Sequence, residues 1–393
     1  MASEMEKNRI FITCPKGIQT SLASEIQSLG FPLLSESFSG VETEGTLDDT
    51  MRLNLYLRTG HRVLYLLSGF TAKTPDELYA KTAKVPWEDY IYETGYVSVT
   101  STVDTPTITD SRYANVKCKD AIADRFMKKF GRRPDSGAER DRAVVHLHWK
   151  HEECRLYIDT SGVPLSKRGY RKIPMAAPLQ ETLASAIIIA TGWRDSGNFI
   201  NPMCGSGTLA IEAAMIGLEK APGILRNNFC FMHLRGFNRA LWEGLRLEAS
   251  QRSKRTLQNR IIATDISSKA VDAARKNAMT AGVEHLIEFS ICDFKDTIVP
   301  EGSGTVLLNP GYGERMGEID QLAGTYAGIG DFFKQKCRGY TGYVFTGNPG
   351  LAKKIGLRSK RKIQFFNGAI ECRLLEYELY EGTKKTSKTQ SAP

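Results

Sequence analysis

The spacing of apolar residues changes near residue 180, and two kinds of structure follow from it. Beyond that point, short apolar runs alternate with longer segments whose apolar residues recur every three or four positions. The runs predict strands and the longer segments predict helices, an alternation typical of a doubly wound, mostly parallel sheet. We expect helices at 207–216, 267–282 and 323–336. We expect strands at 197–202, 260–264, 287–292, 306–309 and 343–346, and two last strands at 363–366 and 372–380.

The first 172 residues carry shorter and less regular elements. Apolar alternation predicts strands at 10–13, 40–42, 63–70, 96–103, 143–148 and 156–160. Helical spacing predicts helices at 18–29 and 114–130. We interpret this half as two small α+β modules, at 1–70 and 71–172, that precede the sheet domain at 173–382. A Ser/Thr-rich, basic tail at 383–393 is expected to be disordered.

Composition excludes several classes of protein. With 41% apolar and 25% charged residues among 393, the chain has the make-up of a globular protein of two or three domains. No apolar run reaches the roughly 18 residues of a membrane span, and the first residues lack an apolar signal core. The eight cysteines and six histidines form no metal-ligand spacing. We therefore expect no metal, no membrane association and a reduced, cytoplasmic location.

The distribution of charge is more informative than the net value of +9. Basic residues gather in the helix at 114–130 and its flanks, and again around Tyr170. The first group fits a solvated helix end as well as a binding surface. The second interleaves an aromatic ring with four cations, a pattern that favours contact with a phosphate backbone. Its cations are Lys167, Arg168, Arg171 and Lys172.

A glycine-rich turn joins the strand at 197–202 to the helix that follows it. The turn, residues 201–208, contains Gly205 and Gly207, which permit a tight turn and a close approach of backbone to a ligand. The same spacing fits the looser dinucleotide fingerprint. That alternative needs an acid roughly 20 residues later, whereas the acid at the end of the next strand, Asp265, follows much later because of a polar insertion.

Two acids follow strand ends in the manner of a nucleoside pocket. Asp265 can accept hydrogen bonds from both ribose hydroxyls, and Asp293 can accept one from an adenine amine. Either residue alone is more often a helix cap or a solvated loop residue. In series with the glycine turn and with Asn309-Pro310-x-Tyr312, they predict a cofactor pocket.

Asn309-Pro310-Gly311-Tyr312 stands at the carboxyl end of a buried strand, where open α/β sheets bind ligands. The Asn309 side-chain oxygen and the Pro310 carbonyl can both accept hydrogen bonds from one planar amine. Tyr312 can stack on the ring that carries that amine. These three residues are the predicted catalytic group.

These motifs resemble those of S-adenosylmethionine-dependent methyltransferases, and the tetrapeptide is similar to the Asn-Pro-Pro-Tyr signature of enzymes that methylate amino nitrogens. Asp110 to Tyr113, Asp159 with Ser161-Gly162, and residues 168–171 and 177–184 resemble one family in particular. It is the THUMP-domain family of ribosomal large-subunit guanine-N2 methyltransferases. The resemblance implies ferredoxin-like and THUMP modules before a Rossmann-like sheet with an antiparallel last strand.

The resemblance also implies partners and residue roles. It makes S-adenosylmethionine the cofactor and large-subunit ribosomal RNA the substrate, methylated to N2-methylguanosine. The implied cofactor-binding residues are Glu181, Thr182, Asn201, Pro202, Cys204, Gly205, Gly207, Thr208, Asp265, Ile266, Asp293 and Asn309. The implied RNA-binding residues are Arg112, Lys117, Lys167, Arg168, Arg171, Lys172 and Arg315.

Two departures keep alternatives open. Gly311 replaces a second proline that would hold the loop extended, and Asn201 replaces a usual aspartate near the positive end of the cofactor. The motif alone also fits methylation of adenine N6 in DNA or of a protein glutamine. A weakened enzyme that acts as an RNA-binding or ribosome-assembly factor is the third alternative. The sequence indicates no oligomeric state.

Overall fold

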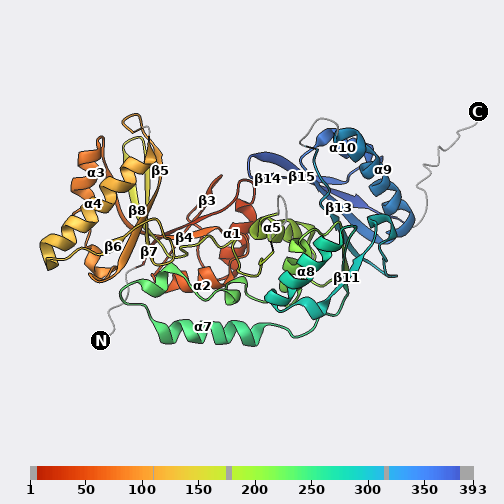
Figure 1. Cartoon of the computed structure of the whole chain (residues 1–393), viewed down its shortest axis with the longest axis horizontal. Helices are drawn as coiled ribbons and strands as arrows, with labels where there is room; N and C mark the ends of the chain where they lie inside the picture. The colour runs from red at the N-terminus through yellow and green to blue at the C-terminus, as the bar shows by residue number, and fades with distance from the viewer. Residues whose placement is uncertain (1–6, 109, 174–178, 314–317, 381–393) are drawn as a thin grey trace, which may run out of the picture. The chain divides into compact units, whose positions relative to one another are not determined.

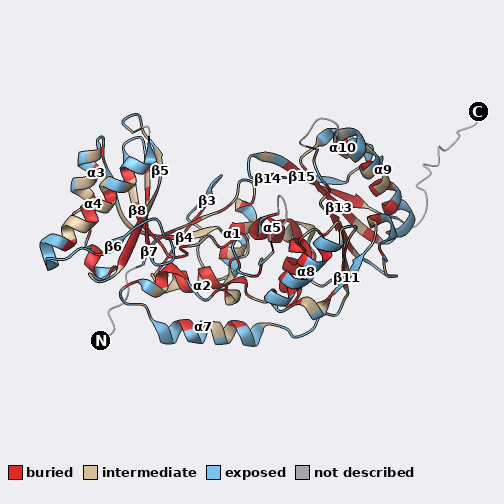
Figure 2. Cartoon of the chain, in the orientation of Figure 1, coloured by how far each residue is buried: buried red, intermediate tan, exposed pale blue. Residues whose placement is uncertain are grey.

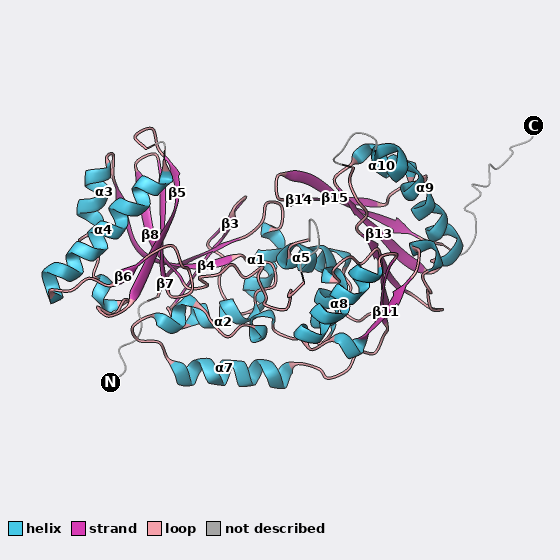
Figure 3. Ribbon diagram, viewed as in Figure 1, coloured by secondary structure: helices cyan, strands magenta, loops and turns pink. Residues whose placement is uncertain are grey.

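The computed structural model of the chain describes residues 7–108, 110–173, 179–313 and 318–380 (Figure 1). They form two compact units, each with its own sheet and helices (Figure 3). The amino-terminal unit comprises residues up to 171 together with 180–186 and 218–255, and the carboxyl-terminal unit comprises 172–179, 187–217 and the residues from 256 on. Helix α5 (Glu181–Thr191) contains the boundary between them.

The amino-terminal unit is built on one eight-stranded sheet with the order β2-β3-β1-β4-β8-β7-β5-β6. Its strands are β1 (Asn8–Thr13), β2 (Ser35–Ser37), β3 (Gly40–Gly45), β4 (Arg62–Thr71), β5 (Tyr96–Asp104), β6 (Asp135–Ser136), β7 (Ala143–Lys150) and β8 (Glu153–Asp159). Its helices are α1 (Gln19–Ser28), α2 (Asp49–Tyr56), α3 (Pro75–Thr82), α4 (Ser111–Phe130) and α7 (Arg239–Arg252), with short 3₁₀ turns η1 (Trp87–Asp89), η2 (Pro222–Leu225) and η3 (Cys230–His233).

Strand β4 joins the two modules that the sequence suggested. Its first residues pair with β1, and Leu64 to Thr71 pair with β8 along the other edge. The ladder therefore runs without interruption across the boundary that we placed at residue 70. A bulge between Leu66 and Ser68 lets one long strand serve both neighbours.

The predicted helix at 114–130 is confirmed as α4, with a start three residues earlier. Asp110 caps it, because its side chain accepts a hydrogen bond from the Arg112 backbone N–H at 2.9 Å. Gly131 ends it in the left-handed conformation, φ +67°, that a helix C-terminus commonly needs. Local sequence thus determines both ends of this helix.

The carboxyl-terminal unit contains a seven-stranded sheet with the order β11-β10-β9-β12-β13-β15-β14. Its strands are β9 (Asn198–Pro202), β10 (Ile261–Asp265), β11 (Ile287–Ile291), β12 (Gly304–Leu308), β13 (Tyr340–Thr346), β14 (Arg361–Asn367) and β15 (Ile370–Glu378). Its helices are α6 (Thr208–Gly217), α8 (Ser268–Ala281), α9 (Glu318–Lys336) and α10 (Pro349–Lys354), with 3₁₀ turns η4 (Glu284–Leu286) and η5 (Phe294–Asp296).

The strand order reverses at β9, and this reversal creates the position for a ligand. From β9 the chain moves outward through β10 and β11, and then returns to β12 on the other side of β9. Strands β9 to β13 are parallel, whereas β15 pairs antiparallel with β13, which confirms the expected antiparallel last strand. Open α/β sheets bind ligands at such a switch point, beyond the carboxyl ends of the strands. Burial is concentrated on these strands and on the helix faces against them (Figure 2).

Several elements were not predicted from the sequence, among them α2, α3 and α7. Helix α7 lies in the segment that we interpreted as a polar insertion. Asn238 caps it through the Leu241 N–H, and it buries Trp242, Leu245 and Ala249 on one face. That spacing of three and four positions was a helical signal in the sequence. No described helix is both long and apolar enough to span a bilayer.

Candidate active site

The predicted cofactor residues of the carboxyl-terminal unit meet at one edge of its sheet. The ladder sets Pro202 at the end of β9 beside Thr264, and Asp265 at the end of β10 beside Ile291. Strand β12, which ends just before Asn309, pairs with the other side of β9. The carboxyl ends of four parallel strands therefore bring together the glycine turn, both acids and the Asn-Pro pair.

The turn after β9 has an unusual backbone conformation. Met203, Gly205 and Gly207 all have positive φ, of 58°, 53° and 81°. A β-carbon at Gly207 would lie 2.8 Å from the Ala274 β-carbon of α8, so only glycine fits this contact. Met203 has no such freedom, and its left-handed backbone is a strained conformation of the kind that clusters at functional sites.

Asp265 holds this turn and keeps capacity for a ligand. Its two carboxylate oxygens accept hydrogen bonds from the Gly205 N–H at 3.0 Å and the Ser267 N–H at 2.9 Å. A carboxylate has about four acceptor positions, so ribose hydroxyls can still bind. The next residue, Ile266, is 73% exposed, which offers an apolar surface beside the acid.

Asp293 occupies the position of a helix cap, one of the two roles that the sequence allowed. Its side chain accepts a hydrogen bond from the Lys295 N–H at 3.0 Å and begins η5. One oxygen is engaged there, and the residue is only partly buried. Contact with an adenine amine stays a prediction.

Asn201 carries a buried hydrogen-bond acceptor that the protein leaves unsatisfied. Its Nδ2 donates to the Leu307 carbonyl of β12 at 2.8 Å, which fixes the orientation of the amide. Its Oδ1 has no donor among the described residues, although the residue is 0% exposed. A buried acceptor without a partner is costly. A cofactor with a cationic amino group would satisfy it, so the residues fit S-adenosylmethionine at this point.

Residues 309–313 follow β12 and form the Asn309 loop, in which Tyr312 contacts the predicted acceptor Asn309 directly. Its hydroxyl donates to Asn309 Oδ1 at 2.9 Å, and its ring packs edge-on against Phe345 with 6.3 Å between centroids. Burial raises the pKa of Tyr312 well above its ordinary value, so the hydroxyl keeps its proton. We predicted Tyr312 as a stacking surface for the substrate ring, a role that stays a prediction.

Two residues that sequence reasoning missed hold the backbone of this loop. The Tyr326 hydroxyl donates to the Gly311 carbonyl at 3.1 Å, and Asn348 Nδ2 donates to the Tyr312 carbonyl at 3.0 Å. Tyr326 lies in α9 and Asn348 caps the start of α10, and no sequence motif marks either residue. A β-carbon at Gly311 would come no closer than 3.7 Å to Leu322, so the position has room for a larger residue.

Glu181 and Thr182, also predicted to bind the cofactor, belong to the amino-terminal unit. Glu181 forms an ion pair with Arg171 at 3.4 Å. The Thr182 hydroxyl lies 2.8 Å from Nε2 of His61. Burial, assisted by Arg168, lowers the pKa of His61 to about 4, so the imidazole is neutral at pH 7.

Arg168 is a correction to the predicted RNA-binding group. It is 1% exposed, and its guanidinium donates to the backbone carbonyls of Leu165, at 2.8 Å, and of Arg58. Tyr170 is also buried, so the ring between the cations belongs to the core. A run of charges is no guide to exposure when neighbouring carbonyls can satisfy a guanidinium, and here they do. Arg168 therefore stabilises the backbone at Leu165 and Arg58.

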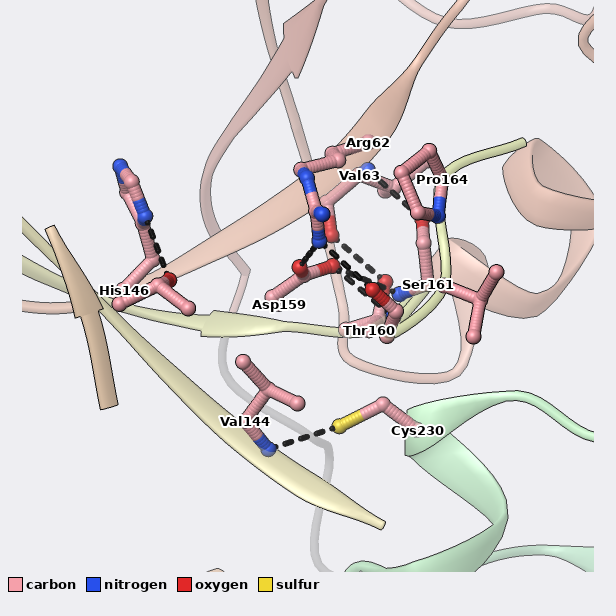
Figure 4. Close-up of polar contacts among 12 residues, drawn as sticks. Arg62, Val63, Val144, His146, Asp159, Thr160, Ser161, Pro164 and Cys230 are labelled. Atoms are coloured by element: carbon pink, nitrogen blue, oxygen red, sulfur yellow. Dashed lines mark hydrogen bonds and ion pairs between the residues drawn. The ribbon is translucent and has the colours of Figure 1, made fainter. Parts of the chain in front are cut away.

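The same region contains the buried ion pair between Arg62 and Asp159 (Figure 4). Asp159 also accepts hydrogen bonds from the N–H groups of Ser161 and Gly162, each at 3.1 Å. The resemblance singled out Asp159, Ser161 and Gly162 without a role. Their contacts make them structural, because they hold the chain where it leaves β8.

The other predicted RNA-binding residues have mixed surroundings. Arg112 pairs with Asp110 and Lys117 with Asp76, whereas Lys167 and Lys172 are exposed. Arg315 lies outside the described residues. Their contact with RNA stays a prediction. The described ranges contain no group of three or more His, Cys, Asp or Glu side chains that could hold a metal.

Comparison with known protein families finds three matches along the chain. Residues 168–376 match the family described as RMKL-like, methyltransferase domain. Residues 9–64 match the RlmL ferredoxin-like domain, and residues 72–159 match the THUMP domain.

Two curated relatives align with nearly the whole chain. The ribosomal RNA large subunit methyltransferase K/L of Syntrophotalea carbinolica is 39% identical over 95% of this chain and 54% of its own length. A protein of Synechocystis named as an RNA methyltransferase is 34% identical over 94% of this chain and 96% of its own length. The chain thus spans about half the length of the K/L relative.

Two solved structures of proteins described as methylating enzymes have folds similar to that of this chain. A protein described as a methyltransferase and solved with SAH is 26% identical over 96% of this chain and 100% of its own, with a TM-score of 0.87. A protein of Listeria monocytogenes described as an N6-adenine-specific DNA methylase is 30% identical over 96% and 97%, with a TM-score of 0.85.

Proposed function

Because the chain belongs to the RMKL-like methyltransferase family, whose cofactor is S-adenosylmethionine, we propose that it methylates an amino nitrogen of RNA. The amine we propose is N2 of guanine in large-subunit ribosomal RNA. The observation that carries the proposal is the position of Asn309 and Pro310 at the carboxyl end of β12, directly across the switch point from the β9 turn.

The residues that would hold the cofactor surround the β9 turn. Asn201 Oδ1 would accept from its amino group, and Asp265 would accept from its ribose hydroxyls. Gly205 and Gly207 would leave room for its close approach to the backbone. When bound, the cofactor supplies an electrophilic methyl group on a sulfonium.

Asn309 and Pro310 would prepare the amine for attack. The amine on C2 of guanine is a poor nucleophile, because its lone pair is delocalised into the ring. Hydrogen bonds from its two N–H groups to Asn309 Oδ1 and the Pro310 carbonyl would favour a pyramidal nitrogen with a localised lone pair. Positioning and electrostatics then provide most of the acceleration. A general base is not needed during attack, because the alkylated ammonium is acidic and loses its proton readily.

Tyr312 gains a second proposed role from its hydrogen bond to Asn309. An amide oxygen has two lone pairs, so Asn309 Oδ1 can accept from the Tyr312 hydroxyl and from the substrate amine together. The tyrosine would thereby fix which way the amide faces, as a positioning residue.

The choice of RNA rests on the amino-terminal half and on the relatives. Residues 72–159 match the THUMP domain, and the relatives named above are called RNA or ribosomal RNA methyltransferases. A paired guanine is unreachable inside a duplex, so the target is flipped out or already unpaired.

The first prediction concerns Asn309→Ala. We expect methyl transfer to fall about 100-fold or more, because a group that stabilises the transition state is lost, with unchanged RNA affinity. Labelled methyl transfer to ribosomal RNA and nucleoside mass spectrometry would measure it. Tyr312→Phe is the matched variant, because it removes only the hydroxyl. It should lower kcat and leave KM for RNA unchanged. Full turnover by Asn309→Ala would remove this residue from the mechanism.

The Listeria neighbour supports a second candidate, methylation of the N6 amine of adenine in DNA. The same pair of acceptors would serve either amine. Parallel assays with ribosomal RNA, DNA and a protein glutamine substrate distinguish these candidates. Transfer to DNA alone would contradict the RNA proposal, and RNA binding without any transfer would support a weakened factor with Gly311 in its loop.

A further inference from the structure

The carboxyl-terminal unit contains a second concave surface beyond the predicted site. It is a groove of about 800 Å³ between α10, the segment after it, and strands β14 and β15. We call it the α10 groove, and Figure 1 labels the elements that surround it. Its described lining includes basic residues at four positions, Lys353, Arg358, Lys362 and Arg373.

The charge of the α10 groove is unbalanced. All four cations are exposed, and Glu371 is the one acid among the described lining residues, paired with Arg373 at 3.1 Å. No described carboxylate forms an ion pair with Lys353, Arg358 or Lys362.

Two cations next to Lys362 in sequence lie outside the groove lining and are paired. Lys360 pairs with Glu378, and Arg361 pairs with Glu376 at 2.8 Å. Lys362, the next residue of β14, has no such partner within the described chain. Unpaired cations in a concave surface raise the local concentration of an anionic ligand.

The lining is also partly apolar. Leu357 and Ile370 are half-buried residues of the groove, and Pro349 is an exposed one. A free phosphate would use the cations alone. A nucleic-acid strand would use both parts, because its phosphates meet cations while its bases meet apolar surface.

One end of the α10 groove lies next to the loop that carries Asn309. Thr346 and Gly347, at the end of β13, line the groove. The Tyr326 hydroxyl lies 2.7 Å from Thr346 Oγ1 and donates to the Gly311 carbonyl. A β-carbon on Gly347 would lie 3.2 Å from the Tyr312 ring. A strand in the groove would therefore pass beside the proposed amine site.

We propose that the α10 groove binds the single-stranded RNA segment next to the methylated nucleotide. Lys353, Arg358 and Lys362 would contact its phosphates, and the apolar lining would contact a base. This inference rests on the proposed function, and it adds a binding surface that none of the sequence motifs marks.

The test is the triple variant Lys353→Glu/Arg358→Glu/Lys362→Glu. All three side chains are exposed, so the fold should tolerate the change. A matched control reverses three exposed lysines of α8 and α9 in Lys276→Glu/Lys334→Glu/Lys336→Glu. Affinity for a single-stranded RNA oligonucleotide would be measured between 50 and 200 mM salt, together with KM for ribosomal RNA.

We expect the groove variant to bind RNA at least tenfold more weakly than the control. Its salt slope, log K against log salt, should be smaller by about 2, because about 0.7 counterions are released for each single-strand phosphate contact. Affinity for S-adenosylmethionine should not change. Equal losses in both variants, or an unchanged slope, would overturn the proposal.

Binding and catalysis fail separately in this experiment. If the wild-type protein methylates no RNA while the groove variant loses oligonucleotide affinity, the proposed function is wrong. The α10 groove would then still be a binding surface for single-stranded RNA. If the wild type and the groove variant methylate RNA with equal KM and bind it with equal salt slopes, the α10 groove does not bind RNA. The proposed function would then be unaffected.

Discussion

At the scale of single residues, the side-chain amide of Asn201 uses its donor within the fold, whereas its acceptor oxygen has no hydrogen-bond partner among the described residues. Its Nδ2 bonds the Leu307 carbonyl, and its buried Oδ1 has no donor within the described chain. The resemblance implied Asn201 as a cofactor-binding residue that departs from a usual aspartate. An aspartate could not donate to the Leu307 carbonyl, whereas the Asn201 amide bonds β12 through Nδ2 and keeps Oδ1 available for a ligand.

Asn201→Ala should weaken S-adenosylmethionine binding about tenfold or more, because hydrogen bonds to charged groups contribute about 1.5–3 kcal/mol. Titration calorimetry would measure it. Asn198→Ala is the matched control at the other end of β9, where that asparagine bonds the Tyr340 hydroxyl at 2.9 Å. The control should lose stability and keep its affinity. Equal affinities for both variants would rule Asn201 out as a cofactor contact.

Residue types and spacing predicted which residues gather at the carboxyl ends of the parallel strands, among them Gly207 and Asn309. They failed where the outcome depends on what lies near in space. Arg168 was expected at RNA and lies buried against backbone carbonyls. Tyr326 and Asn348 hold the Asn309 loop from distant positions, so no local pattern could mark them.

At the scale of elements, a buried carboxylate ties η1 to α4. Glu88 is 7% exposed and accepts two hydrogen bonds from Arg125 and one from Lys129, each at 2.6 Å. These contacts, that of Arg125 foremost, lower the pKa of Glu88 to about 2. Periodicity predicted α4, because its buried face is regular. It could not predict that one acid from a separate turn would anchor it.

Glu88→Gln should lower the free energy of unfolding by about 2 kcal/mol at pH 7, because hydrogen bonds to a charged group are lost. Since the folded-state pKa lies below the ordinary 4.5, the wild type should lose this stability as pH falls from 4.5 towards 2. Denaturant unfolding at several pH values would measure it. Glu93→Gln, which breaks an exposed pair with Arg235, should cost far less. Parallel pH profiles for wild type and Glu88→Gln would contradict the assignment.

At the scale of the whole molecule, alternation of strands and helices predicted the carboxyl-terminal sheet, and the family resemblance implied its antiparallel last strand. The division into units was harder to foresee. The family matches separate residues 9–64 from 72–159, as our boundary at 70 did, and β4 joins both into one sheet. Residues 218–255 also belong to the amino-terminal unit, far along the chain from its other parts. Local patterns carry no information on such long-range packing.

The position of β4 has a consequence during synthesis of the protein. Strand β8, which pairs with one edge of β4, emerges from the ribosome about 80 residues later, roughly 4–16 s at ordinary translation rates. For that time an open strand edge can pair with other chains. Nascent chains arrested before β8 should therefore recruit chaperones more than chains arrested well beyond it, which crosslinking on purified ribosomes would measure. Equal recruitment at both lengths would mean that the growing chain shields this edge by other contacts.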